Sequence, residues 1–164
     1  MSNLYICPTP IGNLQDISAR VLDTLETVDV IYCEDTRRAR KLVENFSITT
    51  PLKSYFVGNE KIKIAEIEKA LTNGKNVALI SDAGTPLISD PGNDLIRHLI
   101  INNFNIISIP GPSSVLTALT LSGFELSEFQ FLGFVPKVSN EKKAFVVKLL
   151  NSEMPSVCFT SPKR

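Results

Sequence analysis

The sequence predicts an α/β domain built on a mainly parallel sheet, followed by the start of a second α/β domain. Short apolar runs alternate with longer segments of helical periodicity, as in successive βαβ units. The run at 77–80 is apolar throughout, which is typical of a strand buried on both faces of a parallel sheet. A length of 164 residues suffices for one complete domain and part of another.

The first domain is expected to span residues 1–123 and to alternate strands with helices. Apolar runs rich in β-branched residues predict the strands, and apolar residues three or four apart predict the helices. Thr36, Asn59 and Ser113 are side chains that can cap helix N-termini, and Gly74 suits a helix end. In order along the chain, we expect a strand at 4–7, a helix at 18–25, a strand at 28–33, a helix at 36–46, a strand at 52–57, a helix at 59–72, a strand at 77–80, a helix at 93–102, a strand at 105–109 and a helix at 113–121.

The pattern changes after Gly123, and residues 124–164 are expected to begin a second domain. An aromatic strand is expected at 129–134, a basic amphipathic helix at 140–150 and a strand at 157–160. Because a sheet of only these two strands would be poorly covered, we expect this domain to be incomplete.

Composition excludes several classes of protein. No apolar run approaches the roughly 20 residues that span a bilayer, and the N-terminus lacks the basic stretch of a signal peptide. We therefore expect a cytoplasmic protein without a membrane partner. The three cysteines lie far apart, outside any metal-ligand spacing, and Cys7 and Cys33 fall in apolar runs that predict buried thiols. The single histidine, His98, lies within a helical segment and favours a structural role, so we predict no metal site.

The formal net charge of zero argues against a broad basic surface that holds nucleic acid. One local cluster of cations is present at Arg37, Arg38, Arg40 and Lys41. It fits either a nucleic-acid contact or an ordinary solvated helix face, and the sequence does not separate the two.

Three of the expected strands end in turns rich in proline and glycine, at 8–13, 81–92 and 110–114. The carboxyl ends of parallel strands share one edge of the sheet, where ligands bind. Neither a P-loop nor a dinucleotide fingerprint is present, so the residues alone predict a crevice for an unidentified ligand. Asp82 fits a ligand contact or a cap of its own turn, and the serines at 113 and 114 also suit a helix start.

Five segments carry a resemblance to a known family. They are PTPIGNLQDIS at 8–18, EDTR at 34–37, SDAGTPLISDPG at 81–92, PGPSS at 110–114 and LGFVPK at 132–137. In this order they resemble the ribosomal RNA small-subunit methyltransferase I family, which belongs to the tetrapyrrole methylases, or class III methyltransferases. The resemblance implies a tetrapyrrole-methylase-like fold with S-adenosylmethionine in the cleft between two α/β domains. It also implies a homodimer that methylates the ribose 2′-hydroxyl of a decoding-region cytidine of 16S rRNA in the small ribosomal subunit.

The resemblance further implies which residues form the site. It assigns Arg37 and Lys137 to the substrate, and Thr160 stands where the family's Phe-x-Glu-Ser-Pro segment has glutamate. The residues that it assigns to the cofactor are Pro8, Pro10, Ile11, Asp82, Gly84, Thr85, Ser113, Ser114, Phe159 and Thr160.

A ribose hydroxyl is a weak nucleophile, so a general base would assist methyl transfer. Glu34 and Asp35 are candidates because they follow a buried strand, although they equally suit capping of the next helix or pairing with Arg37 and Arg38. Two other functions remain open at this point. One is C-methylation of a tetrapyrrole; the other is a truncated, inactive chain that only binds cofactor or dimerises.

Overall fold

The computed structural model describes residues 2–161, which divide into two compact units, Met1–Ser113 and Ser114–Arg164. The division lies at Ser113 rather than at the expected Gly123, because the helix that begins at Ser114 packs against the last strand of the second unit. Between residues 2 and 161, no helix is both long enough and apolar enough to cross a membrane.

The first unit is built on a five-stranded sheet in which every paired strand is parallel, as the sequence predicted. Its order is β3-β2-β4-β1-β5. The central strand, β4, and its neighbour β2 consist entirely of buried residues. The strands are β1 (Asn3–Cys7), β2 (Val30–Cys33), β3 (Leu52–Ser54), β4 (Val77–Ile80) and β5 (Asn105–Ser108).

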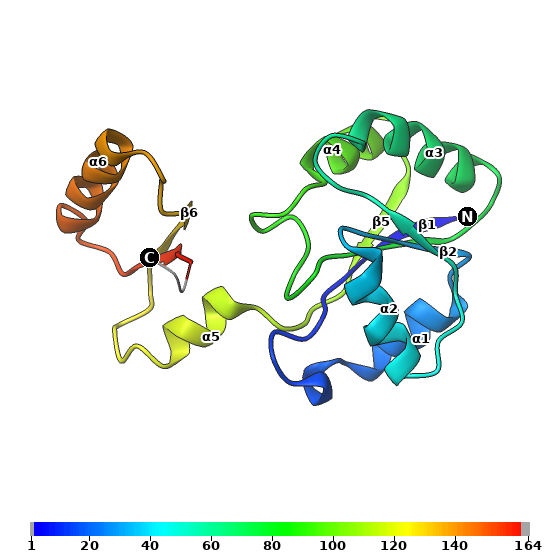
Figure 1. The fold of residues 1–164 in the computed structure, drawn as a ribbon, viewed down its shortest axis with the longest axis horizontal. Helices are drawn as coiled ribbons and strands as arrows, with labels where there is room; N and C mark the ends of the chain where they lie inside the picture. Colours follow the sequence, from blue (N-terminus) through cyan, green and yellow to red (C-terminus); the bar gives the residue numbers. More distant parts are fainter. Residues whose placement is uncertain (1, 162–164) are drawn as a thin grey trace. The chain divides into compact units, whose positions relative to one another are not determined.

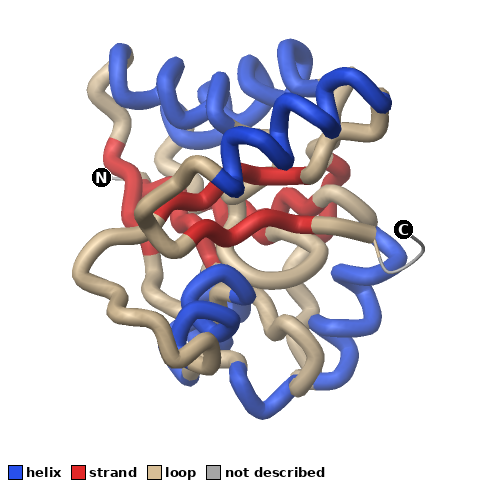
Figure 2. The backbone as a smooth tube through the Cα atoms, turned by 90° about the vertical axis from the view of Figure 1, so that its left-hand side faces the viewer, coloured by secondary structure: helices blue, strands red, loops and turns tan. Residues whose placement is uncertain are grey.

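Helices cover both faces of this sheet (Figures 1 and 2). On one face, α1 and α2 bury Leu25 and Val43 against the sheet, and on the other α3 and α4 bury Ile67 and Leu99. Burying one such side chain contributes about 1.5–3 kcal/mol, so these two apolar layers hold the strand ends in place. The helices are η1 (Leu14–Asp16), α1 (Ala19–Thr27), α2 (Thr36–Asn45), α3 (Glu60–Thr72) and α4 (Asn93–Ile101).

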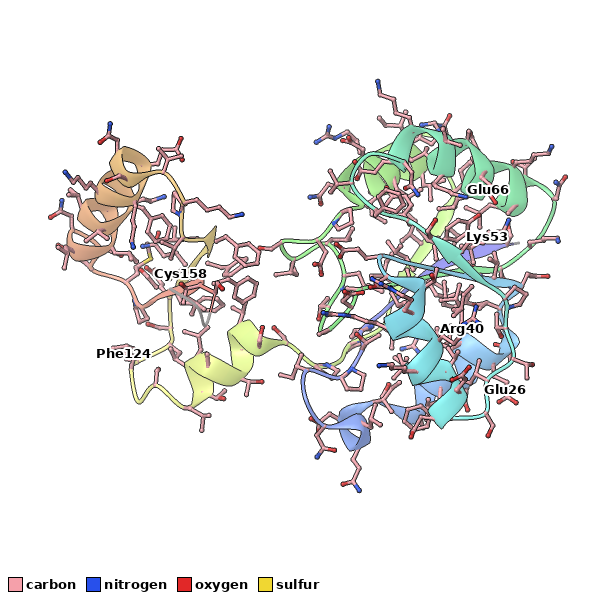
Figure 3. All side chains as sticks on the ribbon, in the orientation of Figure 1. Glu26, Arg40, Lys53, Glu66, Phe124 and Cys158 are labelled. Carbon is pink, nitrogen blue, oxygen red and sulfur yellow. The ribbon has the colours of Figure 1, made fainter. Side chains whose placement is uncertain are left out.

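Contacts between elements add to these layers. Lys53 of β3 forms an ion pair with Glu66 of α3 (Figure 3), and His98 of α4 lies 3.1 Å from the carboxylate of Glu68. Cys7 and Cys33 are buried as predicted, and burial raises the pKa of both thiols to about 12. They are therefore protonated, structural residues at neutral pH.

Helix ends differ from the expectation at α2. Asp35, and not Thr36, is the N-cap residue, because its carboxylate accepts a hydrogen bond of 2.9 Å from the backbone N–H of Arg37. Asn59 occupies the N-cap position of α3, but its side chain accepts from the N–H of Phe56 instead. Asp35 therefore caps the N-terminus of α2 in place of Thr36.

The second unit is described by itself. It contains α5 (Ser114–Thr120), β6 (Gln130–Phe134), α6 (Ser139–Leu150) and β7 (Ser156–Phe159), with β6 and β7 paired in parallel. The ring of Phe159 packs against those of Phe131 and Phe134, at centroid distances of 5.0 and 5.3 Å. No residue of α6 is buried, and the buried residues of this unit's helices are Val115 and Leu119 of α5.

Candidate functional site

The loops that follow β1 and β4 are joined at the carboxyl edge of the sheet. The backbone of Thr9 and Gly84 forms an antiparallel bridge with two N–H···O bonds of 2.9 Å. The hydroxyl of Thr9, which is buried, donates to the carbonyl of Ser81 at 3.1 Å. Loops separated by more than seventy positions are thereby held at one rim, as expected of parallel strand ends.

The third loop joins the same rim. The Thr85 hydroxyl donates to the carbonyl oxygen of Pro112 at 3.0 Å. Gly111 lies so close to Pro8 that a Cβ built on the glycine would be 2.8 Å from the proline Cβ. All three proline- and glycine-rich segments therefore form one connected rim.

Backbone conformation in the 81–92 loop favours glycine at two positions, Gly84 and Gly92, the latter with a φ of +129°. Gly84 has a φ of +79°, and a Cβ built there would lie 3.3 Å from Cγ2 of Ile11. Leu87 and Ser89 adopt the left-handed region as well, with φ of +75° and +68°. Such residues cluster where surrounding contacts over-determine the backbone, often at functional sites.

Asp82 ties this rim to α2. One carboxylate oxygen accepts from the backbone N–H of Asp35 at 3.2 Å, and the other lies 3.2 Å from the guanidinium of Arg38. These contacts of Asp82 run to α2 and not to its own turn, the cap being one of the two alternatives that the sequence left open. They hold the start of α2 beside the end of β4.

Asp35 is engaged by Arg37, one of the two outcomes that the sequence left open. The guanidinium donates to both carboxylate oxygens, at 3.0 and 2.8 Å. These hydrogen bonds and the N-cap hold the pKa of Asp35 well below its usual range. A carboxylate so occupied is a poor proton acceptor at neutral pH.

We expect Asp35→Asn to keep turnover within about twofold of the wild type, because asparagine also caps helices. Asp35→Ala, which removes the cap, should lower the melting temperature while Asp35→Asn preserves most of it. Thermal unfolding and turnover of both variants test this. A loss of turnover in Asp35→Asn without a change in melting temperature would assign Asp35 a chemical role.

Glu34 and Asp90 have the opposite electrostatic environment. Burial raises the pKa of Glu34, with a contribution from the charge of Asp82. Burial, then the charges of Glu34 and Asp82, raise the pKa of Asp90 to about 6. Both carboxyls line a water-sized cavity of about 10 Å³ beside Ser81. A carboxyl with a pKa close to neutral is suited to accept a proton.

Asp90 is the residue that sequence reasoning missed. It lies in the SDPG stretch of the long loop, and the sequence shows only that it precedes a Pro-Gly turn. Its proximity to Glu34 depends on the pairing of β2 with β4, which brings the two loops together. A search for carboxylates after adjacent strands would have included it.

The other residues assigned from the resemblance are placed as follows. Pro8 is buried, Pro10 and Ile11 are half-buried on the first loop, and Ser113 is half-buried before α5. Ser114 is the exposed first residue of α5. Three more belong to the second unit: the exposed Lys137 after β6, the half-buried Phe159 at the end of β7, and the exposed Thr160.

Comparison with known proteins identifies the family to which the chain belongs. Residues 3–164 match the family described as Tetrapyrrole (Corrin/Porphyrin) Methylases. The chain is 44% identical over 165 residues to Ribosomal RNA small subunit methyltransferase I of Thermotoga maritima, covering 100% of this chain and 73% of that protein. It is 42% identical over 161 residues to the protein of the same name in Vibrio cholerae, covering 98% of this chain and 56% of that protein. The chain thus spans little more than half the length of the Vibrio cholerae relative.

Two solved structures share the fold. Diphthine synthase superposes with a TM-score of 0.74 at 18% identity, covering 98% of this chain and 66% of that one. Uroporphyrin-III-C-methyltransferase from Thermus thermophilus superposes with a TM-score of 0.61 at 19% identity, covering 84% and 61%. By sequence, the chain therefore belongs to the ribosomal RNA small subunit methyltransferase I family of tetrapyrrole (corrin/porphyrin) methylases.

Proposed function

We propose that this protein transfers the methyl group of S-adenosylmethionine to the ribose 2′-hydroxyl of a cytidine in the decoding region of 16S rRNA. Its substrate would be the small ribosomal subunit, and it would act as a homodimer. The observation that carries the proposal is the 44% identity over the whole chain to a relative named for small-subunit rRNA methylation. The likeness to uroporphyrin methyltransferase concerns the fold alone, so it does not favour a tetrapyrrole substrate.

The residues at the rim suit S-adenosylmethionine. The cofactor carries a sulfonium and an ammonium group, and Glu34, Asp82 and Asp90 provide carboxylates where β2 and β4 end. An opposite charge nearby would favour the ionised form of each carboxyl. When bound, the cofactor supplies a methyl group activated for in-line displacement. The cofactor would be held by the remaining residues that the resemblance assigns to it, which are Pro8, Pro10, Ile11, Gly84, Thr85, Ser113, Ser114, Phe159 and Thr160.

The chain's own residues would then align the reactants and take up a proton. Alignment of two reactants can lower a barrier by roughly 7–11 kcal/mol, and no protein nucleophile is needed. Of the two bases that the sequence suggested, Glu34 has the raised pKa and Asp35 the lowered one. Glu34 and Asp90 are therefore the proton acceptors in this proposal, and Asp35 positions Arg37, which would contact RNA together with Lys137.

Transfer of tritiated methyl from S-adenosylmethionine to purified small ribosomal subunits that lack the modification tests the proposal. We expect label in 16S rRNA that is recovered as 2′-O-methylcytidine after digestion to nucleosides. Large subunits serve as the control and should stay unlabelled. Label in a porphyrin precursor, with none in RNA, would favour the tetrapyrrole alternative. Heat of cofactor binding without label in either would favour a chain that only binds cofactor.

A further inference from the structure

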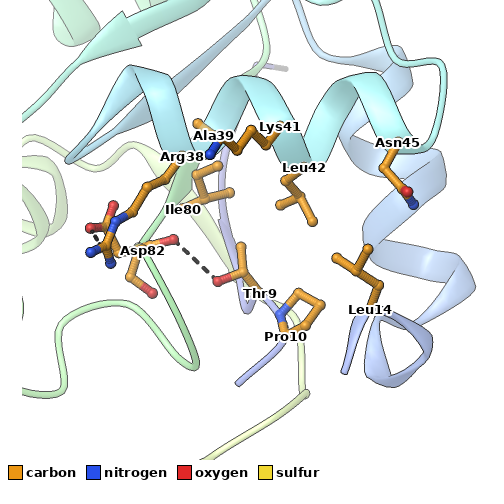
Figure 4. Close-up of a pocket in the computed structure, with 11 residues that line it drawn as sticks. Thr9, Pro10, Leu14, Arg38, Ala39, Lys41, Leu42, Asn45, Ile80 and Asp82 are labelled. Atoms are coloured by element: carbon orange, nitrogen blue, oxygen red, sulfur yellow. Dashed lines mark hydrogen bonds and ion pairs between the residues drawn. The ribbon is translucent and has the colours of Figure 1, made fainter. Parts of the chain in front are cut away.

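A cleft of about 230 Å³ lies between the first loop, η1 and α2, on the α1–α2 side of the sheet (Figure 4). Pro10, Leu14 and Leu42 give it apolar walls. Arg38, Lys41 and Asn45, which follow one another along α2, give it a polar side. The cleft is thus lined by apolar and cationic side chains, and the carboxylate of Asp82 lines it as well.

Arg38 is held in a fixed place at the cleft. Its guanidinium lies 3.2 Å from the carboxylate of Asp82, which also accepts from the backbone of Asp35 (Figure 4). Unstacked bases of single-stranded RNA pack on aromatic rings or on the plane of an arginine guanidinium. The ion pair favours a position of the guanidinium beside Asp82, while 68% of the arginine side chain stays exposed to a ligand.

Two further cations of α2 are available to a phosphate. Among residues 2–161, Arg40 and Lys41 have no carboxylate within ion-pair distance, whereas Arg37 and Arg38 are paired with Asp35 and Asp82. Lys41 lines the cleft and also a neighbouring hollow of about 350 Å³, which is lined by Arg40 and Glu44 as well. Arg40 is labelled on α2 in Figure 3. Charge that the protein does not neutralise itself favours an anionic ligand at the mouth of the cleft.

We propose that this cleft binds one splayed nucleotide of the RNA substrate. Its base lies between Leu14, Leu42 and the guanidinium of Arg38, the amide of Asn45 meets a base edge, and the phosphate lies on Lys41 and Arg40. At about 230 Å³ the cleft is smaller than the roughly 300–1,000 Å³ of sites for drug-sized ligands, so it suits a single base rather than a larger ligand. The identity of the RNA rests on the proposed function. The binding of a nucleotide in this cleft rests on the cleft alone.

Two exposed residues of the cleft can be changed with little risk to folding. Asn45→Trp, at the last residue of α2, places a large ring in the cleft. Lys41→Ala removes one phosphate contact. Their matched controls lie on α3, on the other face of the sheet: Thr72→Trp at the last residue of that helix, and Lys61→Ala at an exposed lysine.

The measurement is the fluorescence anisotropy of a labelled single-stranded oligoribonucleotide with the decoding-region sequence, titrated at several salt concentrations. We expect Asn45→Trp to raise the dissociation constant about tenfold, because the indole ring would fill the space that the base occupies. Lys41→Ala should reduce the salt slope by about 0.7, the change for one lost phosphate contact. Both controls should bind as the wild type does.

The outcomes separate this inference from the proposed function. Binding that Asn45→Trp weakens, together with absence of methyl transfer by the wild type, would retain the nucleotide site and reject the transferase assignment. Wild-type affinity in Asn45→Trp and Lys41→Ala, or no binding by the wild type at low salt, would overturn the site even if RNA is methylated. Titration of cytidine 5′-monophosphate, with amide shifts expected at Leu14, Leu42 and Asn45, gives a reading that does not depend on activity.

Discussion

Replacing Gly84 by alanine is expected to abolish tight binding of S-adenosylmethionine, whereas the same change at Gly74 is expected to leave binding intact. The two glycines have nearly the same backbone conformation, with φ of +79° and +78°. Alanine in that region costs about 1–2 kcal/mol at either position. Only at Gly84 does the added Cβ meet other loops, at 3.3 Å from Ile11 and 3.7 Å from the carbonyl oxygen of Pro112.

The Gly84 contacts link all three loops, because the same residue exchanges two hydrogen bonds with Thr9. A shift of a few tenths of an ångström at this point moves the first and third loops together. Isothermal titration with S-adenosylmethionine and thermal unfolding measure the two effects separately. Equal affinities of Gly84→Ala and Gly74→Ala, at equal loss of stability, would mean that the rim does not hold the cofactor.

Asp90→Asn is expected to make the protein more stable and less active at neutral pH. The folded state raises the pKa of Asp90 from its ordinary value of 3.8 to about 6. Between these values the folded protein binds more protons than the unfolded chain, so this residue's contribution to stability falls as pH rises through that window. Above about pH 6, Asp90 is ionised in the folded protein and its unfavourable effect on stability is complete. Asparagine removes it, which should raise the free energy of unfolding by about 1 kcal/mol at pH 7.5 after allowance for solvent screening.

Denaturant unfolding at pH 7.5 and at pH 3.5 checks the sign of the Asp90 effect, since the difference between wild type and variant should vanish at the lower pH. Asp23→Asn, an exposed carboxylate of α1, makes the same change in formal charge and serves as the control. Greater stability of the wild type at pH 7.5 would show that Asp90 is not held in an unfavourable environment.

The rate should respond in the other direction. A general base contributes about 10²- to 10⁴-fold, so transfer by Asp90→Asn should fall by about a hundredfold or more. The wild-type rate should decline below about pH 6, and this acid limb should be missing in the variant. An unaltered pH–rate profile would leave Glu34 as the sole acceptor among the candidates.

The sequence predicted the sheet because its signals are local. The four residues of β4 are apolar without interruption, and the expected bounds 77–80 match the observed strand. The order of the strands depends on pairings across distant segments, such as Leu4 with Val77, which no local pattern contains. The short η1 gave no periodicity to detect, because three residues make less than one α-helical turn.

The candidate site was predictable in part for the same reason. Proline and glycine mark the three loops along the chain, and their meeting at one edge follows from parallel strands. Which carboxylate would be paired did not follow from the sequence: Glu34 and Asp35 are adjacent, yet only Asp35 receives the guanidinium of Arg37. The difference arises from the direction in which each side chain leaves the end of β2.

The strand order also has a consequence for synthesis of the protein. β1 pairs only with β4 and β5, so it has no partner until residue 77 and beyond have been translated. Parallel pairings of such separation form late, because a long loop must first close. A nascent chain on the ribosome therefore leaves the apolar β1 segment without its strand partners until the sheet can assemble.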